Sequence, residues 1–440
     1  MRSLIFRSGF SILAGFCFFS LSSVAAEKAR WFKGNTHTHS FWSDGDEFPE
    51  MIADWYKTHQ YDFLAFSDHN SVQDGEKWLP INDPNRPAIL KKYITRFGVI
   101  GVEQEKRNGT NYVRLKKFQE FEPLFQEKGK FLLLRGEEIS ASVPGTPLHI
   151  GAVNVTTLIE PHYGSNVANI TEVIDQNLAA IFEQRKKTRQ PVLGHVNHPN
   201  FQWAITAEEL MAVKNEHFFE VFNGHPHVHN DGDATHSGTE RIWDIMLTHR
   251  LTDLKLPVVY GIATDDCHHY QVWGARKNNP GEGWVMVRAK TLSAKSLIEA
   301  MEQGDFYASS GVTLRDVRRD KKTYTVEVEP TSGVDYTIQF IGTRAGFDPK
   351  SEAVLDKNGT ALRVSRRYSP SIGEVFQEVK GTAATYTLKG DEIYVRAKIV
   401  SSKMKYPEAA ATAQKNSMET FESAWTQPLV NAKVKLASKN

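Results

Sequence analysis

Histidines and carboxylates recur in short groups along the first part of this chain. The first group is His37-Thr38-His39, with Asp44 five residues further on. Residues two apart on a strand point to the same side, so His37 and His39 can reach one metal ion. Asp44 precedes Gly45 in a predicted tight turn and offers a carboxylate to a neighbouring ion. A lone His-x-His motif is weak evidence, and chance histidines explain it equally well.

The same arrangement returns where other predicted strands end. The apolar run Phe63–Phe66 leads through Ser67 into Asp68 and His69. Burying such a pair is costly unless something compensates its charge, which favours a functional role. The remaining groups of this kind are Glu137, Glu138, His149, His195, His198, Asp265, Asp266, His268 and His269. Together these residues predict a metal site built from several strands.

Apolar segments that alternate with amphipathic ones predict the elements that position these side chains. The predicted strands cover residues 33–37, 62–67, 131–136, 148–153, 191–195, 218–222, 258–263 and 284–288. The predicted helices cover residues 47–59, 167–187, 207–215, 239–249 and 294–303. Strands joined by crossover helices form a parallel barrel or a doubly wound sheet. A length of roughly 280 residues is typical of a (β/α) barrel with insertions.

Two stretches depart from this alternation. Residues 72–117 are polar and irregular, so we predict an insertion that lies over one face of the barrel as a lid. After Gly311 the predicted strands, at 323–329, 335–340, 384–388 and 392–399, alternate polar with apolar residues. This alternation is typical of an antiparallel β-sandwich. We therefore predict an α/β domain over 27–311 and a small β-rich C-terminal domain over 312–440.

The first 26 residues have the pattern of a secretory signal peptide. Two arginines precede the apolar run Phe10–Leu21, and small residues end at Ala26, the predicted cleavage site. We expect a periplasmic or secreted protein without stable membrane insertion after cleavage; an N-terminal anchor helix is the alternative. Cleavage would remove Cys17 and leave Cys267 alone, so no internal disulfide is expected.

The composition excludes several classes of protein. With 40% hydrophobic and 24% charged residues, the chain is neither disordered, collagen-like nor a multi-span membrane protein. A net charge of +1 gives no reason to expect nucleic acid as a partner. All sixteen histidines lie between His37 and His269. The segment after His269 is therefore predicted to take no part in metal chemistry.

The order of these motifs resembles the PHP superfamily, named for polymerase and histidinol phosphatase. The motifs H-x-H-x₄-D, S-D-H, G-x-E, a downstream His, H-P and D-x-H occur in family order between Asn35 and Ser310. The signal peptide, the sequence DDxHHY and the β-rich tail resemble its exported carbaryl-hydrolase-like branch. The resemblance implies a distorted (β/α)7 barrel with two or three metal ions at the carboxyl ends of its strands.

The resemblance also implies a set of ligands for each ion. The first ion would take His37, His39, Glu138 and Asp266; the second would share Glu138 and take His149 and His198; the third would take Asp44, His69 and His268. Residues predicted to be catalytic are His37, Asp266, His268 and His225. Mixed histidine and carboxylate ligands suit zinc, manganese or iron better than calcium or magnesium.

Two ligand positions leave a choice between close neighbours. The family's G-x-E spacing selects Glu138 over Glu137, and side-chain alternation lets only one of them face inward. The proline that follows His198 favours it over His195, which would then support a ligand from outside the coordination sphere.

A third choice concerns the last motif. The D-x-H spacing selects Asp266 over Asp265. Cys267 should face away by alternation, with thiolate ligation as the minority alternative. Asp68 is predicted to orient a metal-bound imidazole.

Other polar residues near the predicted strand ends are candidates for binding a substrate. We predict that Asn223 and His225 face the substrate or support the ligands, with a purely structural loop as the alternative. His195 and Arg135 are further candidates. Arg135 and Arg241 could clamp a phosphate, but a surface or helix-capping role is the favoured prediction for both.

The predicted reaction follows from the ions. A water bridging two such ions has its pKa lowered toward neutrality and becomes the nucleophile. We therefore predict an exported metal-dependent phosphoesterase whose partner is a small phosphate mono- or diester. An amide, ester or carbamate hydrolase is the second hypothesis, because the same nucleophile attacks a carbonyl. A metal-dependent binding protein is the third, and the sequence indicates no oligomeric state.

Overall fold

The computed structural model describes residues 28–275, 277–406 and 421–431. The predicted signal peptide lies outside the described residues. Within these three ranges, no helix is long and apolar enough to cross a membrane.

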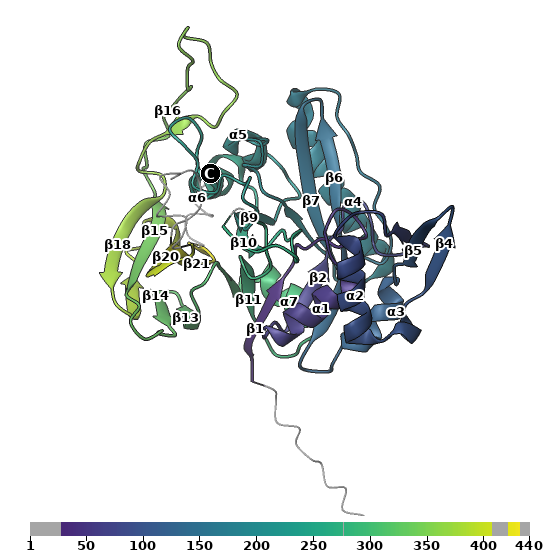
Figure 1. The fold of residues 1–440 in the computed structure, drawn as a ribbon. Coiled ribbons are helices and arrows are strands. Elements are labelled where there is room, and N and C mark those ends of the chain that lie inside the picture. The colour runs from purple at the N-terminus through teal and green to yellow at the C-terminus, as the bar shows by residue number, and fades with distance from the viewer. Residues whose placement is uncertain (1–27, 276, 407–420, 432–440) are drawn as a thin grey trace, which may run out of the picture.

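One large mixed sheet runs through the described chain (Figure 1). Its order is β10-β9-β8-β7-β6-β2-β1-β11-β12-β21-β20-β15-β18, with β22 beside β20. The strands of the first part are β1 (Arg30–Asn35), β2 (Phe63–Phe66), β6 (Leu132–Val143), β7 (Thr146–Val153), β8 (Leu193–Val196), β9 (Phe218–Asn223), β10 (Tyr260–Thr264), β11 (Trp284–Ala289) and β12 (Phe306–Ser309). The later strands are β15 (Tyr336–Arg344), β18 (Glu374–Lys380), β20 (Glu392–Met404), β21 (Phe421–Thr426) and β22 (Leu429–Val430). All eight strands predicted before residue 311 are confirmed.

The strands that carry the predicted ligands form the first part of this sheet. Strands β1, β2 and β6 pair in parallel, as do β8, β9 and β10, whereas β7 is antiparallel to both of its neighbours. The segments that follow β1 and β10 also meet, because His39 N donates to Cys267 O at 2.9 Å. The regular parallel alternation that the sequence suggested is therefore wrong at β7, and also at β11, which pairs antiparallel with β1.

Helices pack against the outer side of these strands. The five predicted helices correspond to α1 (Pro49–Thr58), α4 (Ile170–Thr188), α5 (Ala207–Met211), α6 (Thr239–His249) and α7 (Ala294–Glu302). In α4 the buried residues Ile170, Val173 and Ile174 recur at helical spacing. This apolar stripe covers β6, β7 and β8 and fixes the helix on the sheet.

The predicted insertion is regular, contrary to expectation. It contains β3 (Trp78–Pro80), α2 (Arg86–Phe97), β4 (Gln104–Arg107) and β5 (Thr110–Arg114), followed by α3 (Phe118–Phe125), with the strands in the order β3-β5-β4. Its small core joins Leu79, Tyr93 and Val113 to Phe41 and Phe48. Most of its other side chains are exposed, so the sequence shows little periodicity there.

The C-terminal region is antiparallel, as predicted. A three-stranded sheet of β13 (Leu314–Arg319), β14 (Thr323–Val328) and β19 (Ala383–Thr387) packs through Tyr324 and Val326 against Ile338 of β15 and Ile399 of β20. The short strands β16 (Ser351–Glu352) and β17 (Arg367–Tyr368) pair beyond it. The large sheet continues across residue 311 through the β12–β21 pair.

Candidate metal centre

Glu138 lies at the centre of the candidate site. Its carboxylate oxygens lie 2.8–3.5 Å from ring nitrogens of five histidines: His37, His39, His69, His149 and His198. Burial opposes ionisation of this group, but the surrounding imidazoles hold the pKa of Glu138 well below its usual value. Such a carboxylate remains an anion at neutral pH and attracts cations.

His37 and His39 converge from the end of β1. Their Nε2 atoms are 3.1 Å apart, and Asp266 Oδ1 lies 3.2 Å from each of them. At most one proton fits between two ring nitrogens at this distance. Lone pairs that converge on one point beside carboxylates are the arrangement that a divalent transition metal prefers.

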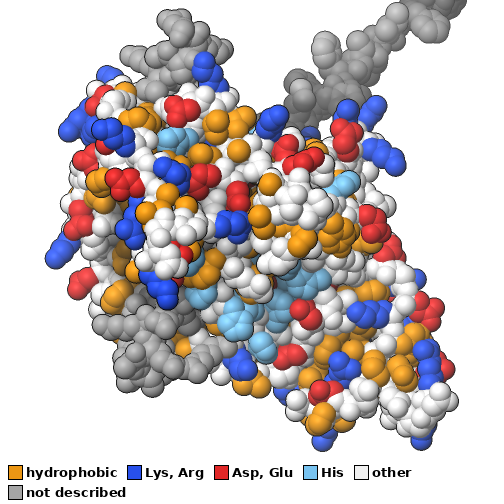
Figure 2. Space-filling view, turned by 90° about the horizontal axis from the view of Figure 1, so that it is seen from above, with side chains coloured by type: hydrophobic (Ala, Val, Ile, Leu, Met, Phe, Trp, Pro, Cys, Tyr) orange, Lys and Arg blue, Asp and Glu red, His pale blue; other side chains and the backbone are white. Residues whose placement is uncertain are grey.

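Asp44 lies on the solvent-facing side of these histidines, and its side chain is more than half exposed. Its carboxylate lies 3.3 Å from His268 Nε2, 3.5 Å from His69 Nε2 and 3.6 Å from His39 Nδ1. Partial burial raises the pKa of Asp44, but hydrogen bonds to His268 and His69 outweigh it and hold this pKa below its usual value. Figure 2 shows histidine side chains gathered at the surface on the upper face of Figure 1.

The donor set fits a cluster of metal ions. Glu138 Oε2 is buried and makes no hydrogen bond of regular geometry, although His69 Nδ1, which also bonds Ser140 Oγ at 2.6 Å, lies only 2.8 Å from it. Four groups of side chains bring their ligand atoms within 4.8 Å of one another: His39–Asp44–His69–His268, His37–His39–Glu138, His37–His198–Asp266 and His69–Glu138–His149. The structure thus brings together all nine predicted ligands at sites that could hold metal ions.

The neighbouring acidic residues point elsewhere. Glu137 Oε1 accepts a hydrogen bond from Ile159 N at 2.8 Å, on the opposite side of β6. Asp265 accepts hydrogen bonds from Tyr56 Oη at 2.6 Å and from the backbone of Glu282 at 2.7 Å. Glu137 and Glu138 thus face opposite sides of β6, as side-chain alternation predicted, and Asp265 bonds away from the cluster.

His195 and Cys267 are buried but make no contact with Glu138. Neither ring nitrogen of His195 has a hydrogen-bond partner, and burial lowers its pKa to about 4. Its ring centroid lies 6.4 Å from that of His37, whereas His198 Nε2 lies 3.1 Å from Glu138. The geometry favours His198 as the ligand, and Cys267 belongs to no group of candidate ligands among the described residues.

Glu220 is a functional candidate that the sequence analysis missed. Its Oε1 lies 2.7 Å from His37 Nδ1, and its Oε2 accepts a hydrogen bond from His198 N at 2.7 Å. Glu220 is fully buried in β9, between apolar residues of the sequence FFEVF. An isolated glutamate inside an apolar strand was the signal for it, because a buried charge needs partners.

Asp68 does not orient an imidazole, contrary to prediction. Its carboxylate accepts hydrogen bonds from Ser40, Ser43 and Gln73 at 2.6–2.8 Å. Asp68 therefore fixes the turn between His39 and Asp44. Glu220 has the role that was predicted for Asp68, since it contacts His37 directly.

Replacing Glu220 with glutamine is expected to weaken metal binding about 10–100-fold, because the anion that orients His37 becomes a neutral amide. Competition with a chelator would measure the metal affinity. Glu216→Gln is the matched control: burial raises the pKa of Glu216 to about 8, so its side chain is already neutral at pH 7. Equal affinities for both variants and the wild type would contradict this role of Glu220.

The candidates for substrate binding have different positions. Asn223 donates to Glu220 at 2.8 Å and to Asp266 at 3.1 Å, so it supports the candidate ligands. The His225 ring lies 5.6 Å from His268, and burial lowers the pKa of His225 to about 4. His225 Nδ1 accepts a hydrogen bond from His227 N, so the proton of the neutral ring lies on Nε2.

The two arginines that were considered as phosphate clamps bond elsewhere. Arg135 Nη1 donates to Thr156 O at 3.0 Å, and its guanidinium packs over Phe118. Arg241 donates to backbone carbonyls of the C-terminal region: Ile372, Tyr368 and Ser369. Both guanidinium groups are engaged with backbone carbonyls, so the prediction that they bind phosphate finds no support in these contacts.

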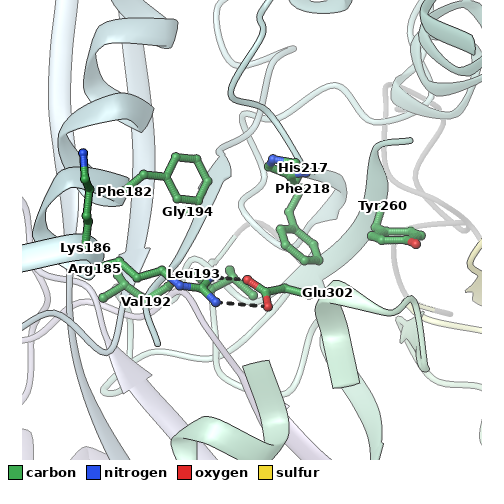
Figure 3. A pocket seen from close by; sticks show the side chains of 10 residues that line it. All are labelled: Phe182, Arg185, Lys186, Val192, Leu193, Gly194, His217, Phe218, Tyr260 and Glu302. Carbon is green, nitrogen blue, oxygen red and sulfur yellow. Dashed lines mark hydrogen bonds and ion pairs between the residues drawn. The ribbon is translucent and has the colours of Figure 1, made fainter. Parts of the chain in front are cut away.

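A separate cavity of about 490 Å³ lies where β8, β9 and β10 begin (Figure 3). Phe182, Phe218 and Tyr260 line it, and Arg185 pairs with Glu302 there. Because the predicted ligands follow the carboxyl ends of these strands, the cavity is not part of the metal centre.

Comparisons with known proteins show only distant similarities. The sequence matches no family profile and no curated protein. A two-domain protein from Bacteroides vulgatus with a predicted PHP-like metal-dependent phosphoesterase is 13% identical, with a TM-score of 0.35, over 84% of this chain and 90% of that one. A proposed metal-dependent phosphoesterase from Bifidobacterium adolescentis is 13% identical, with a TM-score of 0.29, over 56% of this chain and 89% of that one. Similarities this low do not establish a common fold.

Proposed function

We propose that this chain is an exported metal-dependent phosphoesterase of the PHP superfamily, which hydrolyses a small phosphate mono- or diester. The observation that carries the proposal is the buried Glu138 carboxylate in contact with five imidazoles. The motif order in the sequence supports the family. Export rests on the N-terminal sequence alone.

Different residues of the chain would bind the metal ions, position a ligand and contact the substrate. Two or three zinc, manganese or iron ions would supply a water of lowered pKa and would offset negative charge on the substrate. Glu138, Asp266 and the histidines around them would hold these ions. Glu220 keeps the His37 ring in position through Nδ1. His225, neutral and protonated on Nε2, would donate a hydrogen bond to a substrate oxygen.

One observation favours a second candidate function. Arg135 and Arg241 bind backbone carbonyls and do not reach toward the cluster. A carbonyl substrate needs no such clamp, so an amide, ester or carbamate hydrolase is the alternative. A binding protein without catalysis is least favoured, since binding alone does not require so large a set of ligands.

The test combines metal analysis with a substrate panel. Purified protein is expected to contain two or three transition-metal equivalents; one or none would contradict a multinuclear centre. Aryl phosphates, nucleotides and phosphodiesters are expected to be hydrolysed, and turnover of aryl esters or carbamates alone would overturn the phosphoesterase proposal. His37→Ala should abolish turnover of every substrate, whereas His162→Ala, in an exposed loop, should not.

A further inference from the structure

An aromatic side chain stands beside the metal centre. Phe201 follows β8, and its ring centroid lies 5.2 Å from that of His198, 6.4 Å from that of His149 and 5.9 Å from that of His225. The Phe201 side chain is partly exposed. Because this ring borders two candidate ligands and a candidate hydrogen-bond donor, an organic group on a substrate held there would meet it.

The loop that carries Phe201 has an unusual backbone. Gln202 and Trp203 adopt φ angles of 52° and 55°, in the left-handed region that side chains other than glycine rarely enter. The Trp203 ring stacks with those of His229 and His236, at centroid distances of 4.3 Å and 3.9 Å. Such a conformation persists only where the surrounding structure holds it.

A segment of the C-terminal region supplies part of that support. We call residues 361–372 the tail arm; it includes β17 and lies near α5 (Figure 1). Arg363 donates to Ala204 O at 2.6 Å and pairs with Glu209 at 2.9 Å. Ala204 N in turn donates to Phe201 O at 3.1 Å. Two successive hydrogen bonds therefore connect the tail arm to Phe201.

Other contacts fix the tail arm against the same side of the molecule. Ser365 Oγ accepts a hydrogen bond from Ala207 N at 2.9 Å, and Tyr368 Oη donates to Glu208 at 2.9 Å. Arg367 donates to Ala234 O at 3.1 Å, in the loop whose histidines stack on Trp203. The tail arm thus touches both loops that hold the aromatic side chains in place.

We propose that the tail arm positions Phe201 as an apolar wall of the substrate site, so that the C-terminal region selects esters whose phosphate carries a flat aromatic group. This inference rests on the proposed phosphoesterase function. Arg363 is a positioning residue in this scheme, since it acts through Ala204 and does not touch the substrate. The ring of Phe201 would contribute the binding free energy through contact with the aromatic group.

The first test compares two stable substrate analogues, phenylphosphonate and methylphosphonate, by calorimetry on metal-loaded protein. Phe201→Ala and Arg363→Ala are each expected to weaken phenylphosphonate binding about tenfold and to leave methylphosphonate binding unchanged. Arg366→Ala is the matched control, because its guanidinium donates only to Ser351, within the C-terminal region. If Phe201→Ala still prefers phenylphosphonate over methylphosphonate as strongly as the wild type does, the proposal that Phe201 forms an apolar wall is wrong. The same result in Arg363→Ala would show that Arg363 does not position Phe201.

The second test does not depend on ligand binding. Hydrogen exchange of the Ala204 amide is expected to be faster in Arg363→Ala than in the wild type or in Arg366→Ala, because the loop loses its support. Equal exchange in all three proteins would overturn the role of the tail arm. If metal-loaded wild type binds neither phosphonate, the proposed phosphoesterase function fails, and the exchange result still decides whether the arm holds the loop.

Discussion

Replacing Glu138 with glutamine is expected to empty the metal centre and to lower kcat/KM by at least about 1,000-fold. Glutamine keeps the size of the side chain but removes the negative charge at the point where five imidazoles meet. Without that charge, the proposed ions would lose the ligand that they share. Metal content after dialysis and steady-state turnover of the best phosphate ester would measure the effect.

The adjacent residue provides a matched control for this substitution. Glu137 lies on the same strand and is also buried, but its carboxyl group bonds Ile159 N away from the centre. Burial raises the pKa of Glu137 to about 8, so at pH 7 the group is mostly neutral and an amide resembles it. Glu137→Gln should therefore retain its metals and its turnover. Retention of the metals in Glu138→Gln would refute the central role assigned to Glu138.

Replacing Arg396 with methionine is expected to destabilise the protein by about 3–5 kcal/mol. Arg396 on β20 is buried and donates to Asp244 on α6 through Nη2 at 2.7 Å and Nε at 2.9 Å. The substitution would leave the Asp244 carboxylate buried beside Tyr394 Oη without its cationic partner. The midpoint of urea unfolding, followed by tryptophan fluorescence, would measure the loss.

An exposed ion pair in the same region serves as the control. Arg315 on β13 pairs with Glu329 at 2.9 Å, and both side chains are largely solvated. Arg315→Met should leave the unfolding midpoint nearly unchanged, because water screens exposed pairs. The double variant Arg396→Met/Asp244→Leu should recover much of the lost stability, since no charge then remains unpaired. A single Arg396→Met variant as stable as Arg315→Met would contradict a structural role for the buried pair.

The antiparallel direction of β7 was not predicted, although the sequence contains a signal for it. The sequence predicted strands at 131–136 and 148–153 but placed no hairpin between them. In the structure β6 and β7 are longer and only Pro144 and Gly145 separate them, with Gly145 at φ 74°. A parallel connection needs about a dozen residues, so this Pro-Gly turn requires an antiparallel pair.

The insertion shows a limit of a different kind. Residues 72–117 were predicted to be irregular, yet they form three strands and a helix around a small core. That core is completed by Phe41 and Phe48, which precede the insertion in the sequence. Periodicity inside the insertion is weak because part of its apolar partner surface comes from outside it.

The sequence by itself determined which residue types follow which strands, and therefore the chemistry that the site can perform. The motif spacings G-x-E and D-x-H selected Glu138 and Asp266, and the period-two alternation of a strand let only one of Glu137 and Glu138 face inward. The structure agrees with both choices. The direction of each of these side chains depends only on local geometry.

Only the tertiary structure decided which atoms meet. Glu220 reaches His37 across a sequence separation of 183 residues, and Asp68 is directed to the Ser40–Ser43 turn and not to an imidazole. The contact of the tail arm with Ala204 likewise could not be predicted from the sequence. The physical reason is that such contacts depend on the register and packing of elements distant in the chain, which the whole core fixes together.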